Sequence, residues 1–466
     1  METKKLTNAE VNAYGAFGTL LTFSIWVPTC YLSIFMTTYL GISASVMGTI
    51  YLVSMTADIV FSLLAGGLVD SLTFKKGKYL PWINALRWVV MFGSVGQVVN
   101  TSAMPLAFRL VVISVCYMAM HGSMNFVATA QSGIVAAVAG SNMEDRIKLT
   151  TRSTQISAGA SIFLNFGTLP LITFIGKLSG DASLGYTIVG IAYAMFLLIG
   201  TVILNKYLGK YDDPALVGSP GKKFNLADMW RAIAGNDQMV VYALSQFVMQ
   251  TGMNIVGGMG MYYWMLIMDR YQLSSVSSGL STCAGFIFSL FIPSIGRKLG
   301  KVKSQYVATT VSALSNIAIL MLALKSTWYM TAISIVSMAT GYLTYGFGIN
   351  YYLDIGEYGY YKTGKDYRTL CISMSNILMK FGRVGGTSLS GYVLAWIGFD
   401  KFNQMMLSGT LNRATEEFAA FSKTFMGVYC LIPLCAQVIG LMIFIFGYKI
   451  KDEDAVFYAA ENAKKA

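Results

Sequence analysis

Long apolar stretches separated by short polar ones make up most of this chain. Twelve of the stretches have a helical length near or above the roughly 20 residues that cross a bilayer. They lie near residues 13–40, 45–69, 80–101, 108–138, 151–176, 184–206, 238–267, 274–296, 304–324, 327–353, 368–398 and 425–448. The pattern predicts an all-α membrane protein with twelve transmembrane helices.

The longest polar connection falls at the midpoint of the chain, and it contains Pro214, Pro220 and Gly221. Six spans, a polar linker and six spans are typical of a major facilitator fold, in which two six-helix bundles enclose a central cavity. The predicted domains are an N-terminal bundle (1–206), a cytoplasmic linker (207–237), a C-terminal bundle (238–448) and a cytoplasmic tail (449–466). Within the linker, the segment FNLADMWRAIA has helical spacing and predicts a short surface helix.

Composition and charge agree with this interpretation. The chain is 55% hydrophobic and 12% charged, whereas soluble domains are about 25% charged. Of its 34 Lys and Arg residues, 24 lie at the termini and in the even-numbered loops, and seven lie in the opposite loops. The positive-inside rule therefore predicts that both termini are cytoplasmic in a multi-pass protein of the cell membrane.

Several function classes are excluded or disfavoured. The basic residues do not cluster on a soluble domain, so the net charge of +12 does not predict a nucleic-acid partner. Six scattered cysteines and a single histidine do not form a metal motif. No phosphate-binding P-loop is present, so ATP hydrolysis is not expected. We expect no enzyme activity, no cofactor and a monomeric protein.

One acidic residue, Asp58, lies in the middle of a long apolar run, between Leu52 and Asp70. Inserting a carboxylate into hydrocarbon costs roughly 2.5–3.5 kcal/mol or more, so such a residue normally faces a bundle interior and serves an ion or a proton. Asp58 is therefore the first candidate functional residue.

Five segments resemble the glycoside–pentoside–hexuronide:cation symporters, the branch of the major facilitator superfamily that includes the melibiose permeases. They are YGAFG (14–18), the Asp58 helix with KKGKYLPW (75–82), EDRIKLTTR (144–152), LDIGEYGYYKTGKDYR (353–368) and MKFG (379–382). Because they occur in the family's order, the resemblance covers nearly the whole chain.

The sequence also departs from the family's pattern. The second acid of the helix-two motif is Ser62, and the arginine that precedes the first acid is Met55. The two sugar-contacting acids fall at Leu20 and Asn125, and the acid of the last cytoplasmic motif is Tyr360. The family's acidic cavity is largely neutralised in this chain.

The resemblance implies that Asp58 and Lys380 face each other across the cavity. They either form a fixed ion pair or compete, so that a cation at Asp58 displaces Lys380 and couples ion binding to closure. A lone carboxylate suits a proton; Ser62 and Thr56 could supply oxygens for Na⁺.

The candidate substrate residues are His121, Asn125, Arg383, Tyr345 and Lys380. His121 and Asn125 share a helix face, and Asn125 can both donate and accept hydrogen bonds. The surplus positive charge from Arg383 predicts an anionic or strongly polar substrate. Structural hydrogen bonds, or an Arg383 side chain that reaches toward the interface, are the alternative interpretations.

Charged residues at the predicted cytoplasmic helix ends match the family's gate. The gate candidates are Asp70, Arg146, Arg152, Asp354, Glu357 and Arg368.

Together these observations predict a cation-coupled symporter, with a proton or possibly Na⁺ as the coupling ion. It would import a glycoside, a uronide or another small polar or anionic solute by alternating access. An uncoupled facilitator or exporter on the same fold is the main alternative, and a membrane sensor or enzyme is a remote one.

Overall fold

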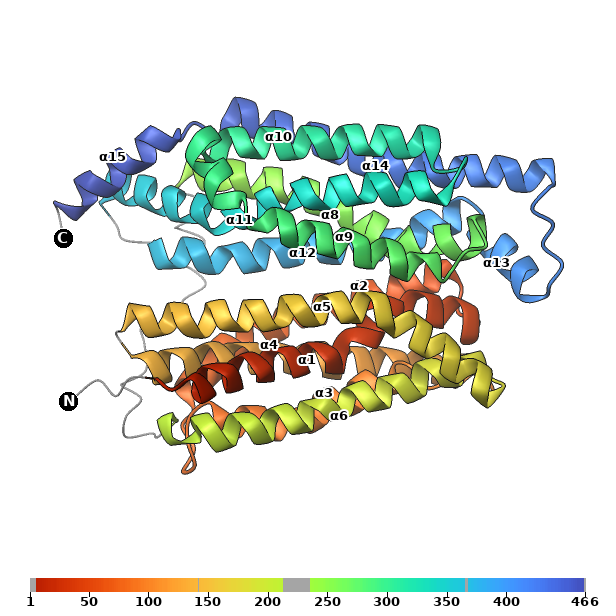
Figure 1. Cartoon of the computed structure of the whole chain (residues 1–466), viewed down its shortest axis with the longest axis horizontal. Coiled ribbons are helices and arrows are strands. Elements are labelled where there is room, and N and C mark those ends of the chain that lie inside the picture. Colours follow the sequence, from red (N-terminus) through yellow and green to blue (C-terminus); the bar gives the residue numbers. More distant parts are fainter. Residues whose placement is uncertain (1–5, 141, 213–234, 365–367, 465–466) are drawn as a thin grey trace. The chain divides into compact units, whose positions relative to one another are not determined.

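The computed structural model describes residues 6–140, 142–212, 235–364 and 368–464, and this part of the chain is almost entirely helical (Figure 1). The six long helices of its first half are α1 (Asn8–Ile34), α2 (Ala44–Ser71), α3 (Leu80–Gly96), α4 (Leu106–Ala139), α5 (Met143–Ser179) and α6 (Ala182–Leu208). Those of its second half are α8 (Asp237–Tyr262), α9 (Leu273–Ser289), α10 (Ile292–Leu322), α11 (Thr327–Thr363), α12 (Arg368–Trp396) and α14 (Glu416–Gly447). Nine helices in the described residues are long and apolar enough to cross a membrane.

The chain divides into two compact units. Unit 1 comprises residues 1–43 and 53–224, and unit 2 comprises residues 44–52 and 225–466. The main boundary therefore falls inside the predicted linker, 207–237. The first turns of α2 group with unit 2, whereas the rest of that helix, including Asp58, groups with unit 1.

The same packing scheme occurs in both units. In unit 1, α1 packs against α5 and α6, and α3 packs against α4 and α6. In unit 2, α8 packs against α12 and α14, and α10 packs against α11 and α14. Both α1 and α8 end in a π-helical turn, η1 (Phe35–Tyr39) and η3 (Tyr263–Ile267). The two units are thus structural repeats, as in transporters built from two related halves.

Helix starts follow local capping chemistry. Thr7, Asn142 and Thr415 each accept a hydrogen bond from a backbone N–H of the first turn of the helix that follows. Such side chains satisfy donors that have no partner within the helix.

Many large apolar side chains point outward, for example Phe92 at 64% exposure and Val202 at 61%. Outward-facing apolar side chains are expected of helices whose solvent is lipid.

The structure differs from the sequence prediction at several helix ends. The predicted span 274–296 is interrupted, because α9 ends at Ser289 and α10 begins at Ile292. Helix α10 is broken at Gly300 (φ +73°), inside the predicted basic loop, so one helical segment ends before this residue and another begins after it. Glycine adopts this backbone conformation without strain. Helix α11 likewise extends through most of the predicted loop, to Thr363.

Two short helices were not predicted, α13 (Phe399–Leu407) and α15 (Asp452–Ala463). The second lies in the predicted cytoplasmic tail and packs against α10 and α11. The short helix predicted within 224–234 lies outside the described residues.

Candidate functional site

Asp58 of α2 contacts Asn125 of α4 inside unit 1. The Nδ2 group of Asn125 lies 2.5 Å from Oδ1 of Asp58 and 3.4 Å from the Asp58 backbone oxygen. An ionised carboxylate only accepts hydrogen bonds, so the amide is the donor. Both side chains are half-buried. The carboxylate of α2 therefore has a polar partner within its own unit.

Helix α4 presents its polar side chains four residues apart, which places them on one face. Asn125 Nδ2 also donates to the backbone oxygen of His121 at 3.1 Å, and the Thr129 hydroxyl donates to the backbone oxygen of Asn125 at 2.8 Å. The imidazole of His121 stacks on the ring of Tyr117, with centroids 4.2 Å apart. This stack and these bonds restrict the orientation of His121 and Asn125.

A close contact between α2 and α4 lies about one turn from the polar pair. A Cβ atom added to Gly122 would lie 2.9 Å from the ring of Phe61, so a larger residue there would require the Phe61 side chain to move. The Phe61 ring of α2 therefore packs directly against α4 near the polar pair. Asp58 and Asn125 thus form one site, although the sequence had assigned them separate roles.

The other candidates for the cation site have different surroundings. Ser62 follows Asp58 by four residues on the same helix face and is half-buried, whereas Thr56 is exposed. Lys380 belongs to unit 2, where it is half-buried on α12. Its pairing with Asp58 stays a prediction.

Helix α12 is positioned by glycines that face α8. A Cβ atom at Gly382 would lie 3.0 Å from the Cβ of Gln250, and one at Gly386 would lie 2.5 Å from the Cβ of Asn254. Lys380 precedes Gly382 by two residues and so projects from another side of α12. Arg383 is exposed. The side chain of Tyr345 lies outside the described residues.

The gate candidates of unit 1 bind neutral groups. Arg146 donates to the backbone oxygen of Gly140 at the end of α4, at 2.7 and 3.1 Å. Arg152 donates to Oδ1 of Asn12 on α1 at 2.8 Å. The side chain of Asp70 lies outside the described residues.

The gate candidates of unit 2 pair with residues that the sequence did not single out. Asp354 forms an ion pair with Lys301 of α10, whose ammonium also lies 3.8 Å from Asp452 at the start of α15. Glu357 accepts a hydrogen bond of 2.7 Å from Asn462 of α15. The tail helix therefore bonds directly to the predicted gate. The side chain of Arg368 lies outside the described residues.

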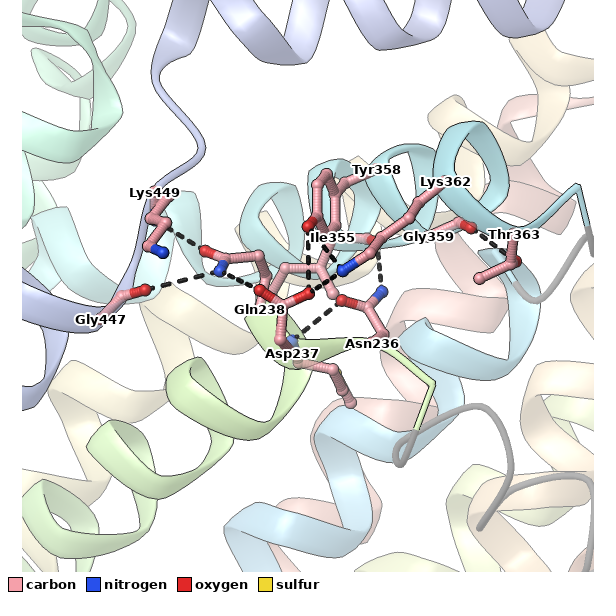
Figure 2. Close-up of polar contacts among 11 residues, drawn as sticks. Asn236, Asp237, Gln238, Ile355, Tyr358, Gly359, Lys362, Thr363, Gly447 and Lys449 are labelled. Atoms are coloured by element: carbon pink, nitrogen blue, oxygen red, sulfur yellow. Dashed lines mark hydrogen bonds and ion pairs between the residues drawn. The ribbon is translucent and has the colours of Figure 1, made fainter.

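Figure 2 shows a second polar cluster of unit 2, where α8 begins beside α11. Asp237 accepts hydrogen bonds from Lys362 at 2.7 Å and from Tyr358 at 3.0 Å. Asn236 donates to the backbone oxygen of Ile355 at 2.8 Å and caps α8 with its own side-chain oxygen. These bonds attach the last residues of the predicted linker to α11.

In unit 1, the buried carboxylate of Asp212 attaches the chain after α6 to the start of α3. It follows η2 (Gly209–Tyr211) and is 3% exposed. It accepts hydrogen bonds from the backbone N–H groups of Lys78, Tyr79 and Leu80, at 3.1, 3.0 and 2.7 Å. The first turn of α3 has no cap from its own N-cap residue, so Asp212 acts as a distant N-cap.

The loop motif before α3 fits this arrangement. At Gly77 (φ +129°), a Cβ atom would lie 2.4 Å from Asp212 Oδ2. Beside it, Glu10 of α1 forms an ion pair with Lys210 at 2.5 Å and accepts a hydrogen bond of 3.0 Å from Tyr211. Three consecutive residues near the start of the predicted linker therefore attach to α1 and to the start of α3. Sequence reasoning missed Asp212; the glycine and proline of KKGKYLPW were the available signal.

Within the described residues, no group of three or more His, Cys, Asp or Glu side chains could hold a metal ion. Two repeated helical units, built from helices long and apolar enough to cross a membrane, are typical of secondary transporters.

Comparisons with known proteins agree with this class. Residues 11–452 match the family model described as MFS/sugar transport protein, and the chain belongs to this family. A putative glycoside/cation symporter of Escherichia coli (strain K12), YagG, is 24% identical over 96% of this chain and 93% of its own length. A putative 2,3-dihydroxypropane-1-sulfonate exporter of the same organism is 22% identical over 65% of each chain. The crystal structure of the nucleoside transporter NupG (D323A mutant) matches with a TM-score of 0.64 and 13% identity, covering 93% of this chain and 99% of that chain.

The protein is therefore a multi-pass membrane transporter of the major facilitator superfamily. It moves a small molecule and is not an enzyme.

Proposed function

We propose that this protein couples the inward movement of one cation to the uptake of a glycoside or a related small polar or anionic solute. The observation that carries the proposal is the Asp58 carboxylate, which lies within a predicted span and is hydrogen-bonded by Asn125 of the neighbouring helix. A carboxylate at this depth is costly unless it serves an ion or a proton.

The coupling ion that this site favours is a proton. A proton needs one carboxylate, whereas Na⁺ needs several oxygen ligands. Asn125 offers its N–H to Asp58, so it contributes a donor there and not a second oxygen. Ser62, on the same face of α2, is the oxygen that would have to join Asp58 in a sodium site.

We further propose that His121 and Asn125 bind substrate hydroxyl groups in unit 1, and that Lys380 and Arg383 supply positive charge from unit 2. In this mechanism, protonation of the Asp58 carboxylate weakens the hydrogen bond that it accepts from the Asn125 amide. The amide can then bond to substrate, which links ion binding to substrate binding. The protein acts as a monomer in the cell membrane, with both termini in the cytoplasm.

An uncoupled carrier or exporter is the second candidate. It is favoured by the relative named as a putative 2,3-dihydroxypropane-1-sulfonate exporter and by the loss of the second helix-two acid at Ser62. In that case Asp58 would have only a structural role.

The test is uptake into proteoliposomes of a defined panel: lactose, raffinose, a methyl glucuronide and 2,3-dihydroxypropane-1-sulfonate. Each is offered with an inward proton gradient, an inward Na⁺ gradient or neither. We expect accumulation of at least one solute to require the proton gradient, and Asp58→Asn to abolish accumulation while counterflow exchange persists. Accumulation that Asp58→Asn leaves intact would contradict the coupling role. Ser62→Ala is the matched control, and we expect it to retain proton-driven uptake.

A further inference from the structure

Helices α3 and α6 carry two polar pairs at their interface. Asn84 and Asn205 exchange side-chain hydrogen bonds of 2.9 and 2.7 Å. One turn further along α3, Nη1 of Arg87 donates to the Thr201 hydroxyl at 2.9 Å. Arg87 follows Leu80, the first residue of α3, by seven residues. Its Cα therefore lies about 10 Å along the axis from the helix start.

The positive charge of Arg87 is not neutralised by the described residues. Among them, no Asp or Glu pairs with Arg87, and the buried Nε has no hydrogen-bond partner. Its other contact is the ring of Trp88, 5.2 Å away. The Thr201 hydroxyl is neutral and donates its own proton to the backbone oxygen of Leu198. A guanidinium within a membrane span is costly and normally has a counter-ion.

The surface beside this charge is apolar and open. Trp88 is 43% exposed and Phe92 is 64% exposed, and their rings stack with centroids 6.3 Å apart. Val202 of α6 is 61% exposed on the neighbouring helix. Toward the predicted cytoplasmic end, Lys206 is exposed on the last turn of α6. The surface thus runs from a cation at the helix end, past the paired asparagines, to Arg87 and exposed aromatic rings.

We propose that this α3–α6 face binds an anionic phospholipid, whose phosphate pairs with Arg87 and Lys206 and whose acyl chain lies along Trp88 and Phe92. The charges are complementary, since a phosphodiester carries the negative charge that the described residues do not supply to the Arg87 guanidinium. The Arg87 side chain can extend toward the headgroup region along the α3–α6 interface. A lipid, and not a soluble anion, is the occupant because the adjoining surface is apolar.

The test uses the full-length protein purified in a neutral detergent. Binding of phosphatidylglycerol and phosphatidylcholine is measured by native mass spectrometry, and the thermal midpoint is recorded with each lipid. We expect phosphatidylglycerol to bind more tightly, and Arg87→Gln to weaken its binding about fivefold, on the scale of one basic residue at a membrane surface. Phosphatidylcholine binding should not change.

Arg109→Gln is the matched control, because Arg109 is a half-buried arginine bonded to the backbone oxygens of Met104 and Leu40. It should leave the lipid preference unchanged. Equal phosphatidylglycerol binding by the wild type and Arg87→Gln would overturn the proposal, as would equal stabilisation by inorganic phosphate. If Arg87→Gln does not fold, Arg87→Lys is tested instead. A retained preference for phosphatidylglycerol over phosphatidylcholine supports the site, and a lost preference contradicts it.

Discussion

Replacing Asp212 by Asn should release the first turn of α3 while the rest of unit 1 stays folded. The carboxylate is 3% exposed and accepts three backbone N–H groups, those of Lys78, Tyr79 and Leu80. An amide keeps one acceptor oxygen, loses the charge and turns an NH₂ group toward these donors. Pro81 has no N–H, so these three amides are the main donors of that turn that a cap must satisfy.

The magnitude follows from the hydrogen bonds. A bond to a charged group contributes about 1.5–3 kcal/mol, and loss of an N-cap costs about 0.5–2 kcal/mol. Because bonds to one carboxylate are not additive, we expect about 3 kcal/mol of local destabilisation. Such a loss corresponds to roughly 100-fold faster amide exchange if the turn opens and closes rapidly.

Hydrogen–deuterium exchange of peptides covering residues 77–83 is the assay. Asp181→Asn is the control, because Asp181 also caps a helix start but is solvent-exposed. The hydrogen bond from the Ser183 hydroxyl holds the pKa of Asp181 below its usual value. Its replacement should affect only the start of α6. Unchanged exchange at 77–83 in Asp212→Asn would refute the N-cap role of Asp212.

Three further outcomes are expected. Asn125→Asp places a second carboxylate beside Asp58 and should make proteoliposome uptake respond to Na⁺; an unchanged ion response would argue against a shared cation site. Gly386→Ala should lower the thermal midpoint, since overpacking typically costs about 1–3 kcal/mol. Gly257→Ala should leave the thermal midpoint unchanged, because nothing lies within 4 Å of the new Cβ. Equal effects of the two substitutions would contradict the close packing of α12 against α8 at Gly386. Asp237→Asn removes the ion pair with Lys362, which is about half exposed, so the unfolding free energy of the protein should fall by less than about 1 kcal/mol. A larger loss would contradict the weak contribution expected of this ion pair.

Apolar periodicity was enough to predict the all-helical fold, because each span must satisfy its own backbone within lipid. It could not locate the ends of α10 and α11. There, the helices extend into charged segments that the sequence predicts as loops: GRKLGKVK is helical on both sides of the break at Gly300, and α11 continues to Thr363. Helix α13 and the tail helix α15 were missed for the related reason that their stability comes from packing against neighbouring helices.

The candidate site was predictable only in part. Asp58 was identified from the cost of a carboxylate in hydrocarbon, and Asn125 from its place in the family pattern. Their direct contact depends on how α2 packs against α4, which no periodicity encodes. Asp212 was missed because its partners are backbone groups 132–134 residues away in the chain.

The central claim is that Asp58 carries the coupling ion. The most direct measurement is the current evoked by a solute jump on proteoliposomes adsorbed to a solid-supported membrane, using whichever panel solute the wild type accumulates. We predict a current in the wild type that shrinks as the proton concentration falls, does not depend on Na⁺, and is absent in Asp58→Asn although that variant still exchanges solute. A current of wild-type size in Asp58→Asn would contradict the account.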